Sequence, residues 1–126
     1  MASLSFVSTA WRALQQPNVL AIDVRSANEY NAQHIPGTLN IPHVHITDAV
    51  SRNVIPSWRD VPLLLFCRSG NRSEMAAKTL RSMGYSNVYN GGTWRDVTEA
   101  ARALSLQFQG GQPVRSAQVR TYYGYT

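Results

Sequence analysis

The fold is decided by the stretch Pro62-Leu63-Leu64-Leu65-Phe66-Cys67-Arg68-Ser69-Gly70-Asn71-Arg72-Ser73. Its apolar half predicts a buried strand over residues 63–66, and residues 74–83 have the apolar spacing of a helix, closed by Gly84. Strand, tight loop and helix therefore follow one another, with the protein's single cysteine at the strand's end. A helix N-terminus offers free N–H donors and positive potential, which favour a thiolate or a bound anion.

Elements of alternating type surround this stretch. We expect an edge strand over residues 4–6 and further strands over residues 19–22, 38–41 and 87–89. Helices are expected over residues 9–16, 26–33 and 94–104, with a short one ending near residue 51. Ser26 and Glu29 form a Ser-x-x-Glu capping box at the start of the second helix. Strands that alternate with helices predict an α/β fold with a mostly parallel sheet, in which ligands bind beyond the strands' carboxyl ends.

The composition is that of an ordinary globular protein. With 126 residues, of which 44% are apolar, the chain predicts one domain with its own core. No apolar run approaches the ~18 residues of a membrane span, and the N-terminus has no basic leader, so we expect a cytoplasmic protein that does not bind membranes. The formal net charge of +5 suits small anionic substrates. The arginines are spread along the chain, which disfavours nucleic-acid binding.

Cys67 cannot form an intramolecular disulfide, so it is either a small core residue or a reactive thiol. A reactive thiolate needs positive potential, which the helix N-terminus, the loop N–H groups, Arg68 and Arg72 would supply. Judged as an isolated pattern, the loop fits a core cysteine and a reactive thiol about equally well. A metal site is disfavoured because the three histidines, among them the pair His43 and His45, have no further cysteine with them.

Several short motifs occur in a fixed order, and as a set they resemble a rhodanese-homology domain. They are Asp23-Val24-Arg25, Glu29-Tyr30, His34-Ile35-Pro36-Gly37, Asn40-Ile41-Pro42, the loop from Cys67 to Ser73, Gly84-Tyr85, and Gly91-Gly92 followed by Trp94. The resemblance implies a rhodanese-like α/β fold whose central, mainly parallel five-stranded sheet is flanked by helices on both faces. It covers residues 1–104, and residues 105–126 would be a C-terminal extension, flexible or docked on the domain.

The same resemblance implies a thiosulfate sulfurtransferase of the rhodanese type that works through a Cys67 persulfide, without metal or organic cofactor. An anionic donor such as thiosulfate would deliver sulfur, and a cyanide, a thiol or a sulfur-accepting protein would remove it. The substrate-binding residues would be those of the loop, Arg68, Ser69, Gly70, Asn71, Arg72 and Ser73. Asp23 and Arg25 would support the site, with Arg25 expected to pair with an acid such as Glu29.

Two alternatives remain at this point. The domain could be a persulfide carrier or partner-binding module without thiosulfate turnover. It could also be a cysteine-dependent phosphatase or arsenate reductase, although family phosphatases place five residues between cysteine and arginine, and here four separate Cys67 from Arg72. The tandem-domain thiosulfate enzymes carry a basic residue at the position of Glu29 and a lysine at that of Ser69. These departures leave the donor open, and the oligomeric state is open as well.

Overall fold

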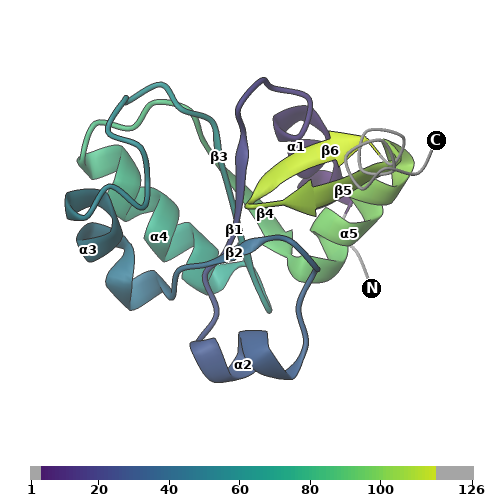
Figure 1. Ribbon diagram of the computed structural model, residues 1–126, viewed down its shortest axis with the longest axis horizontal. Helices are drawn as coiled ribbons and strands as arrows, with labels where there is room; N and C mark the ends of the chain where they lie inside the picture. Colours follow the sequence, from purple (N-terminus) through teal and green to yellow (C-terminus); the bar gives the residue numbers. More distant parts are fainter. Residues whose placement is uncertain (1–3, 116–126) are drawn as a thin grey trace.

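The computed structural model describes residues 4–115, which are built around a four-stranded parallel sheet (Figure 1). The helices are α1 (Leu4–Ala13), α2 (Ala27–Ala32), the short 3-10 helix η1 (His43–His45), α3 (Ile46–Ser51), α4 (Asn71–Ser82) and α5 (Trp94–Ala103). The strands are β1 (Leu20–Asp23), β2 (Leu39–Asn40), β3 (Leu63–Cys67), β4 (Val88–Thr93), β5 (Leu106–Gln109) and β6 (Gln112–Arg115).

The sheet has the order β2-β1-β3-β4, and every neighbouring pair is parallel. Strand β3 lies between β1 and β4, with Asp23 opposite Phe66 and Cys67 opposite Thr93. Because parallel strands end at one edge, the chain leaves β1, β3 and β4 on the same side of the molecule. The α/β class and the flanking of the sheet by helices are confirmed.

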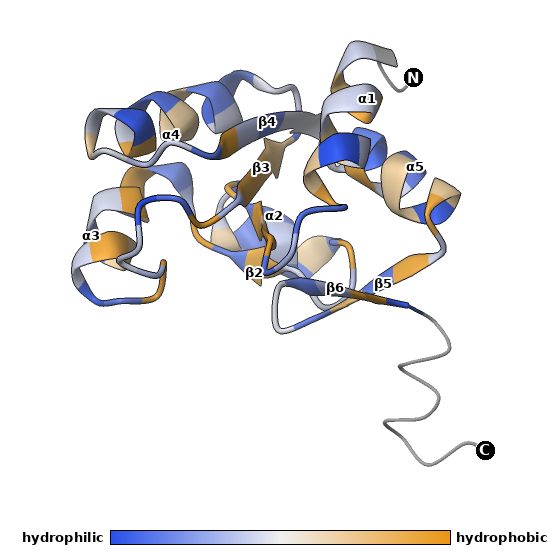
Figure 2. Cartoon of the chain, turned by 90° about the horizontal axis from the view of Figure 1, so that it is seen from above, coloured by the Kyte–Doolittle hydropathy of each residue, from blue (hydrophilic) through white to orange (hydrophobic). Residues whose placement is uncertain are grey.

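Two hydrophobic clusters lie on opposite faces of the sheet. Helices α3 and α4 cover one face and helices α1 and α5 the other, as Figure 1 shows. Side chains alternate between the faces along a strand, so Leu63, Leu65 and Cys67 join the first cluster while Leu64 and Phe66 join the second. All five are fully buried, and Figure 2 shows β3 as an apolar strand between the helices. A strand buried on both faces explains the continuous apolar run before Cys67.

The expected edge strand over residues 4–6 is wrong, and so is the count of five strands. Residues 4–13 form helix α1, in which Phe6, Ala10 and Ala13 have the spacing of one helical face. Ala10 and Ala13 are buried in the cluster shared with α5. Burial of this apolar face stabilises the helical conformation. The main sheet within residues 4–115 therefore has four strands, and the residues predicted as its fifth strand belong to a helix on one face of the sheet.

Beyond residue 104 the chain forms an antiparallel hairpin of β5 and β6. The Ala21 N–H donates to the Gly111 carbonyl at 2.8 Å, and the Gly111 N–H donates to the Gly37 carbonyl at 2.8 Å. Phe108 is buried in the cluster of α1 and α5. Residues 105–115 of the expected extension are thus docked on the sheet, whereas residues 116–126 lie outside the described residues.

The remaining predicted elements occur within a few residues of their expected bounds. The capping box is confirmed: the Glu29 N–H donates to Ser26 Oγ at 3.2 Å, and the Ser26 N–H donates to Glu29 Oε1 at 3.1 Å. Helix α4 begins at Asn71 rather than near Glu74, so Asn71, Arg72 and Ser73 belong to its first turn. In the part of the chain from residue 4 to residue 115, no helix has the length and apolar character needed to cross a membrane.

Candidate active site

Cys67 ends β3 and is fully buried. The Gly70 N–H donates to Cys67 Sγ at 3.0 Å, and Ser73 Oγ lies 3.4 Å from the same sulfur. Gly70 is the residue that precedes α4, and Ser73 stands in that helix's first turn. The sulfur is therefore held at a helix N-terminus, where donors converge on it.

Two opposing effects set the acidity of this thiol. Burial disfavours the charged thiolate and is the largest single contribution. Hydrogen bonds from the Ser73 side chain and from the backbone of Ser73, Ser69 and Gly70 stabilise the thiolate and together outweigh burial, so the pKa of Cys67 is lowered below 9.0. The thiolate is the reactive form of cysteine, and a lowered pKa increases its fraction, which favours a reactive role over a core role.

The backbone around the sulfur depends on two glycines with positive φ angles. Gly70 has a φ of +93° and Gly92, at the end of β4, a φ of +78°. The ring of Phe6 lies against both: a Cβ atom on Gly70 would meet it at 3.2 Å and one on Gly92 at 2.3 Å. The first helix therefore packs against the cysteine loop through an aromatic side chain, a contact that the sequence analysis did not anticipate.

Asn90 of β4 links three segments of the site. Its Oδ1 accepts the Ser73 hydroxyl at 2.7 Å and the Gly92 N–H at 3.0 Å. Its Nδ2 donates to the Gly70 carbonyl at 3.1 Å and to Glu74 Oε1 at 3.2 Å. One side chain thus fixes both groups that approach the sulfur. Asn90 was not predicted as a site residue, although it directly precedes the Gly91-Gly92 motif.

Arg72 is engaged by Glu29 of α2. The two residues form a two-point ion pair, with N–O distances of 2.5 and 2.9 Å. Arg72 lowers the pKa of Glu29 to about 2, chiefly through these hydrogen bonds. The predicted anion-binding arginine therefore already holds a carboxylate that belongs to the protein.

Arg25 pairs with an acid, as expected, but the acid is Asp23 rather than Glu29. Its guanidinium contacts the Asp23 carboxylate at 2.7 and 3.0 Å and donates to the Gln33 carbonyl at 2.7 Å. Asp23 is nearer because it ends β1 only two residues before Arg25, and the Arg25 N–H also donates to its carboxylate at 3.0 Å. This buried pair joins the end of β1 to the segment that follows α2.

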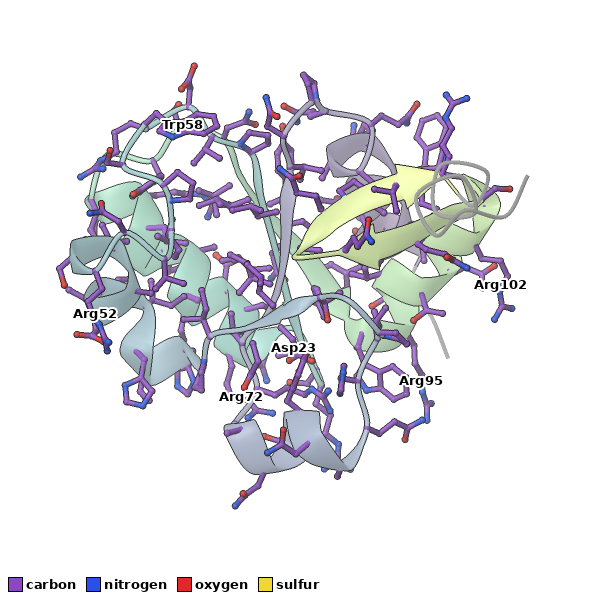
Figure 3. The ribbon with its side chains drawn as sticks, in the orientation of Figure 1. Asp23, Arg52, Trp58, Arg72, Arg95 and Arg102 are labelled. Carbon is purple, nitrogen blue, oxygen red and sulfur yellow. The ribbon has the colours of Figure 1, made fainter. Side chains whose placement is uncertain are left out.

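A hollow of about 520 Å³ lies beside the cysteine loop. Arg25, Arg68, Thr93, Trp94 and Arg95 line it, together with Glu29, Ala32 and Gln33. In Figure 3, Asp23, Arg72 and Arg95 lie at the end of the molecule next to α2, and Trp58 lies at the opposite end. The arginine-lined hollow and the cysteine loop therefore share one edge of the sheet.

The structure places the predicted loop residues unequally around the sulfur. Gly70 and Ser73 contact it, whereas Arg68, Ser69 and Asn71 are exposed, with the Asn71 N–H donating to Ser69 Oγ at 3.4 Å. Over residues 4–115 there is no group of three or more His, Cys, Asp or Glu side chains that could hold a metal ion. The groups that the structure places at the sulfur are the Gly70 N–H and the Ser73 hydroxyl group.

Comparisons with known proteins identify the family of the chain. The model of the rhodanese-like domain matches residues 6–93. The chain belongs to the rhodanese-like family. A rhodanese-like relative in Saccharomyces cerevisiae, a thiosulfate:glutathione sulfurtransferase, is 34% identical over 81 residues, which are 57% of this chain and 58% of that protein.

Two further rhodanese-like proteins are similar over more of their length. The thiosulfate sulfurtransferase GlpE of Pseudomonas savastanoi pv. phaseolicola is 33% identical over 79 residues, 63% of this chain and 71% of that protein. The structure of the human single-domain sulfurtransferase TSTD1 is 28% identical, with a TM-score of 0.56 over 79% of this chain and 95% of that one. The predicted family and the predicted class, a rhodanese-type transferase, are confirmed.

Proposed function

We propose that this protein transfers sulfane sulfur from an anionic donor such as thiosulfate to a thiol or cyanide, through a persulfide on Cys67. The observation that carries the proposal is the surroundings of Cys67 Sγ, where the Gly70 N–H donates at 3.0 Å and the Ser73 hydroxyl group lies 3.4 Å away. Despite its burial, the pKa of Cys67 is lowered by these contacts, which increases the fraction of thiolate, the nucleophile that the reaction needs.

In the first half-reaction the Cys67 thiolate attacks the outer sulfur of thiosulfate. A bond forms between Sγ and that sulfur, the sulfur–sulfur bond of thiosulfate breaks, and sulfite leaves with its electron pair. Both the donor and the resulting persulfide are anions, so the exposed residues Arg68, Ser69 and Asn71 would bind them next to Gly70 and Ser73.

In the second half-reaction a thiolate or cyanide attacks the outer sulfur of the persulfide. The bond to Sγ breaks, the Cys67 thiolate is regenerated, and the acceptor leaves as a persulfide or as thiocyanate. The two substrates bind at different times, so ping-pong kinetics are expected. No step needs a metal or an organic cofactor.

Asp23 and Arg25 are proposed as supporting residues. Asp23 lies opposite Phe66 in the sheet, one residue before the nucleophile, and its carboxylate is held by Arg25. The Asp23 carbonyl accepts the Ile41 N–H at 3.0 Å and Asn40 Nδ2 at 3.0 Å. The Asp23–Arg25 ion pair would hold the end of β1 in a fixed position, and with it the adjoining end of β3 from which the cysteine loop starts.

Intact mass after incubation with thiosulfate tests the proposal. We expect wild-type protein to gain one sulfur atom and the Cys67→Ser variant to gain none. A gain from a protein persulfide or a small persulfide, but not from thiosulfate, would favour the carrier alternative. Turnover of an aryl phosphate that depends on Cys67 would refute sulfur transfer in favour of phosphatase chemistry.

We also propose a cytoplasmic location, where the reducing environment keeps a single thiol free. Cys67 is a free cysteine, and its chemistry requires that it stay so. Microscopy of the tagged full-length protein, with the tag at either end, tests this; an extracellular or periplasmic signal would contradict it.

A further inference from the structure

We propose that Phe6 of α1 is a positioning residue for the reactive cysteine, because its ring holds the backbone of Gly70, whose N–H donates to Cys67 Sγ. Phe6 acts through this backbone and takes no part in the chemistry itself. Its effect on sulfur loading rests on the proposed function, whereas its effect on the acidity of the thiol does not.

The backbone of Gly70 is held at both of its polar groups and at its Cα atom. Its N–H donates to Cys67 Sγ at 3.0 Å, and its carbonyl accepts Asn90 Nδ2 at 3.1 Å. The Phe6 ring lies against the Cα atom between them: a Cβ atom at that position would meet ring atoms Cζ and Cε2 at 3.2 and 3.3 Å. Glycine has more conformational freedom than any other residue, so a contact at its Cα atom restricts the direction in which the N–H points.

The same ring also packs against Gly92 at the end of β4. A Cβ atom on Gly92 would collide with Phe6 Cγ and Cδ2. The Gly92 N–H donates to Asn90 Oδ1 at 3.0 Å, and this oxygen also accepts the Ser73 hydroxyl group at 2.7 Å. Phe6 therefore contacts both glycines whose backbones are joined through Asn90, and the second group at the sulfur, the Ser73 hydroxyl, depends on the same asparagine.

The later turns of α1 anchor Phe6 independently of the cysteine loop. Ala10 and Ala13 are fully buried in the cluster that α1 shares with α5, and α1 also lies against β4 (Figure 2). Phe6 precedes Ala10 by about one helical turn on the same face, and its side chain is only half-buried. Removal of the ring should therefore free Gly70 without detaching the helix.

The acidity of Cys67 links this contact to reactivity. Burial raises the pKa of Cys67, and hydrogen bonds from Ser73, Ser69 and Gly70 outweigh that effect and lower the pKa. A hydrogen bond weakens as its angle and distance depart from the preferred geometry. When Gly70 moves more freely, its N–H stabilises the thiolate less, the pKa rises, and less thiolate is present at neutral pH. A ring that only filled space would affect the stability of the fold and leave this pKa unchanged.

The test measures the ionisation of the thiol directly. Because Cys67 is the single cysteine, a ¹³Cβ label in cysteine gives one NMR signal, whose shift follows the titration of the thiol. We expect the titration curve of Phe6→Ala to lie at higher pH than that of wild type. Its sulfur loading from thiosulfate at neutral pH should be about threefold slower, as for the partial loss of one hydrogen bond to a charged group.

Val7→Ala is the matched control. Val7 is the next residue of α1, is half-buried and packs against the same cluster. The atoms nearest to the Cβ positions of Gly70 and Gly92 do not belong to Val7. We expect Val7→Ala to lower the urea midpoint of unfolding and to leave the titration curve of Cys67 unchanged. An equal displacement of the curve in Val7→Ala and Phe6→Ala would overturn the proposal.

Phe6→Leu is a second variant, which keeps an apolar side chain against the two glycines. Its titration curve should lie between those of wild type and Phe6→Ala. A wild-type curve in folded Phe6→Ala would overturn the proposal, and if Phe6→Ala does not fold, Phe6→Leu decides in the same way. If thiosulfate loads no sulfur onto wild-type protein, the proposed function fails, while the titration curves still decide the role of Phe6.

Discussion

Arg72 and Glu29 form a two-point ion pair beside the nucleophile, with N–O distances of 2.5 and 2.9 Å. The arginine of the cysteine loop is thus occupied by a carboxylate from the capping box of α2. An anionic donor must compete with Glu29 for this guanidinium group or bind to the loop without it.

Replacement of Glu29 should therefore strengthen donor binding. In Glu29→Gln the Arg72 guanidinium group is freed, and we expect the KM for thiosulfate to fall about threefold, as for the gain of one partly exposed ion pair. Steady-state kinetics with thiosulfate measure this. Asp48→Asn, which removes an exposed acid paired with Arg52 at 3.5 Å, is the control and should leave KM unchanged. An unchanged or higher KM in Glu29→Gln would contradict the competition.

The same ion pair should make the free energy of unfolding depend on pH. The folded-state pKa of Glu29, about 2, lies below its ordinary value of 4.5, so the stabilisation is complete above pH 4.5 and is lost as the pH falls toward 2. Because both side chains are partly exposed, we expect no more than about 1 kcal/mol. Urea unfolding of wild type and Glu29→Gln should differ by this amount at neutral pH and converge near pH 2; a constant difference would refute the linkage.

Removal of the Ser73 hydroxyl group should raise the pKa of Cys67. The Ser73 side chain is the largest of the contributions that lower this pKa, and without it the effect of burial is opposed by backbone N–H groups alone. We expect Ser73→Ala to react several-fold more slowly with iodoacetamide at neutral pH, with its rate–pH profile displaced upward. Ser82→Ala, at the far end of α4, is the matched control. A profile equal to that of wild type would exclude the role of Ser73.

Asn90 should matter through the groups that it positions. Asn90→Ala loses the bonds to Ser73, Gly70 and Glu74, and we expect a destabilisation of about 1–3 kcal/mol. Asn90→Asp adds a negative charge next to the thiolate and should raise the pKa of Cys67 further than alanine does. Thermal unfolding and the iodoacetamide profile measure the two effects. Identical rate–pH profiles for Asn90→Ala and Asn90→Asp would show that a charge at position 90 does not change the pKa of Cys67.

The close packing of Phe6 against Gly92 should make any larger residue at position 92 destabilising. In Gly92→Ala the new Cβ would lie 2.3 Å from the Phe6 ring, at a φ of +78°. Gly110→Ala has the same backbone problem, with a φ of +58°, but nothing lies within 4 Å of its Cβ. We expect a loss of about 1–2 kcal/mol in Gly110→Ala from backbone strain and a clearly larger one in Gly92→Ala, measured by urea unfolding. Equal losses would mean that Phe6 moves aside without cost.

Local chemistry determined which elements could be predicted from the sequence. The strand before Cys67 was predictable because burial on both faces makes an apolar run, and Ser26 with Glu29 because a capping box is a contact within four residues. A helix was predicted over residues 9–16, but its first turn, which contains Phe6, was mistaken for a strand because the packing of that turn becomes apparent only in the fold. The hairpin after residue 104 contains few apolar residues. Backbone hydrogen bonds to Ala21 and Gly37 hold it in place, and such bonds do not depend on side chains, so the sequence of the hairpin did not predict them.

The site followed the same division. Cys67, Gly70 and Ser73 were predictable because they lie within one strand–loop–helix unit. The partners of Arg25 and Arg72 could not be predicted. Asp23 and Glu29 are both close to Arg25 along the chain, and only the fold pairs Asp23 with Arg25 and Glu29 with Arg72. Asn90 reaches the loop from a neighbouring strand, and that contact depends on the register of β4.

The Phe6 contact also has a kinetic consequence during synthesis. Phe6 is made early, but Gly92, against which its ring packs, follows Cys67 by 25 residues. At about 5–20 residues per second, the ribosome needs roughly one to five seconds to add them. During that interval the nascent chain already carries its thiol but lacks the strand and turn that complete its surroundings. The packed surroundings of the thiol therefore cannot form until Gly92 has been added to the chain.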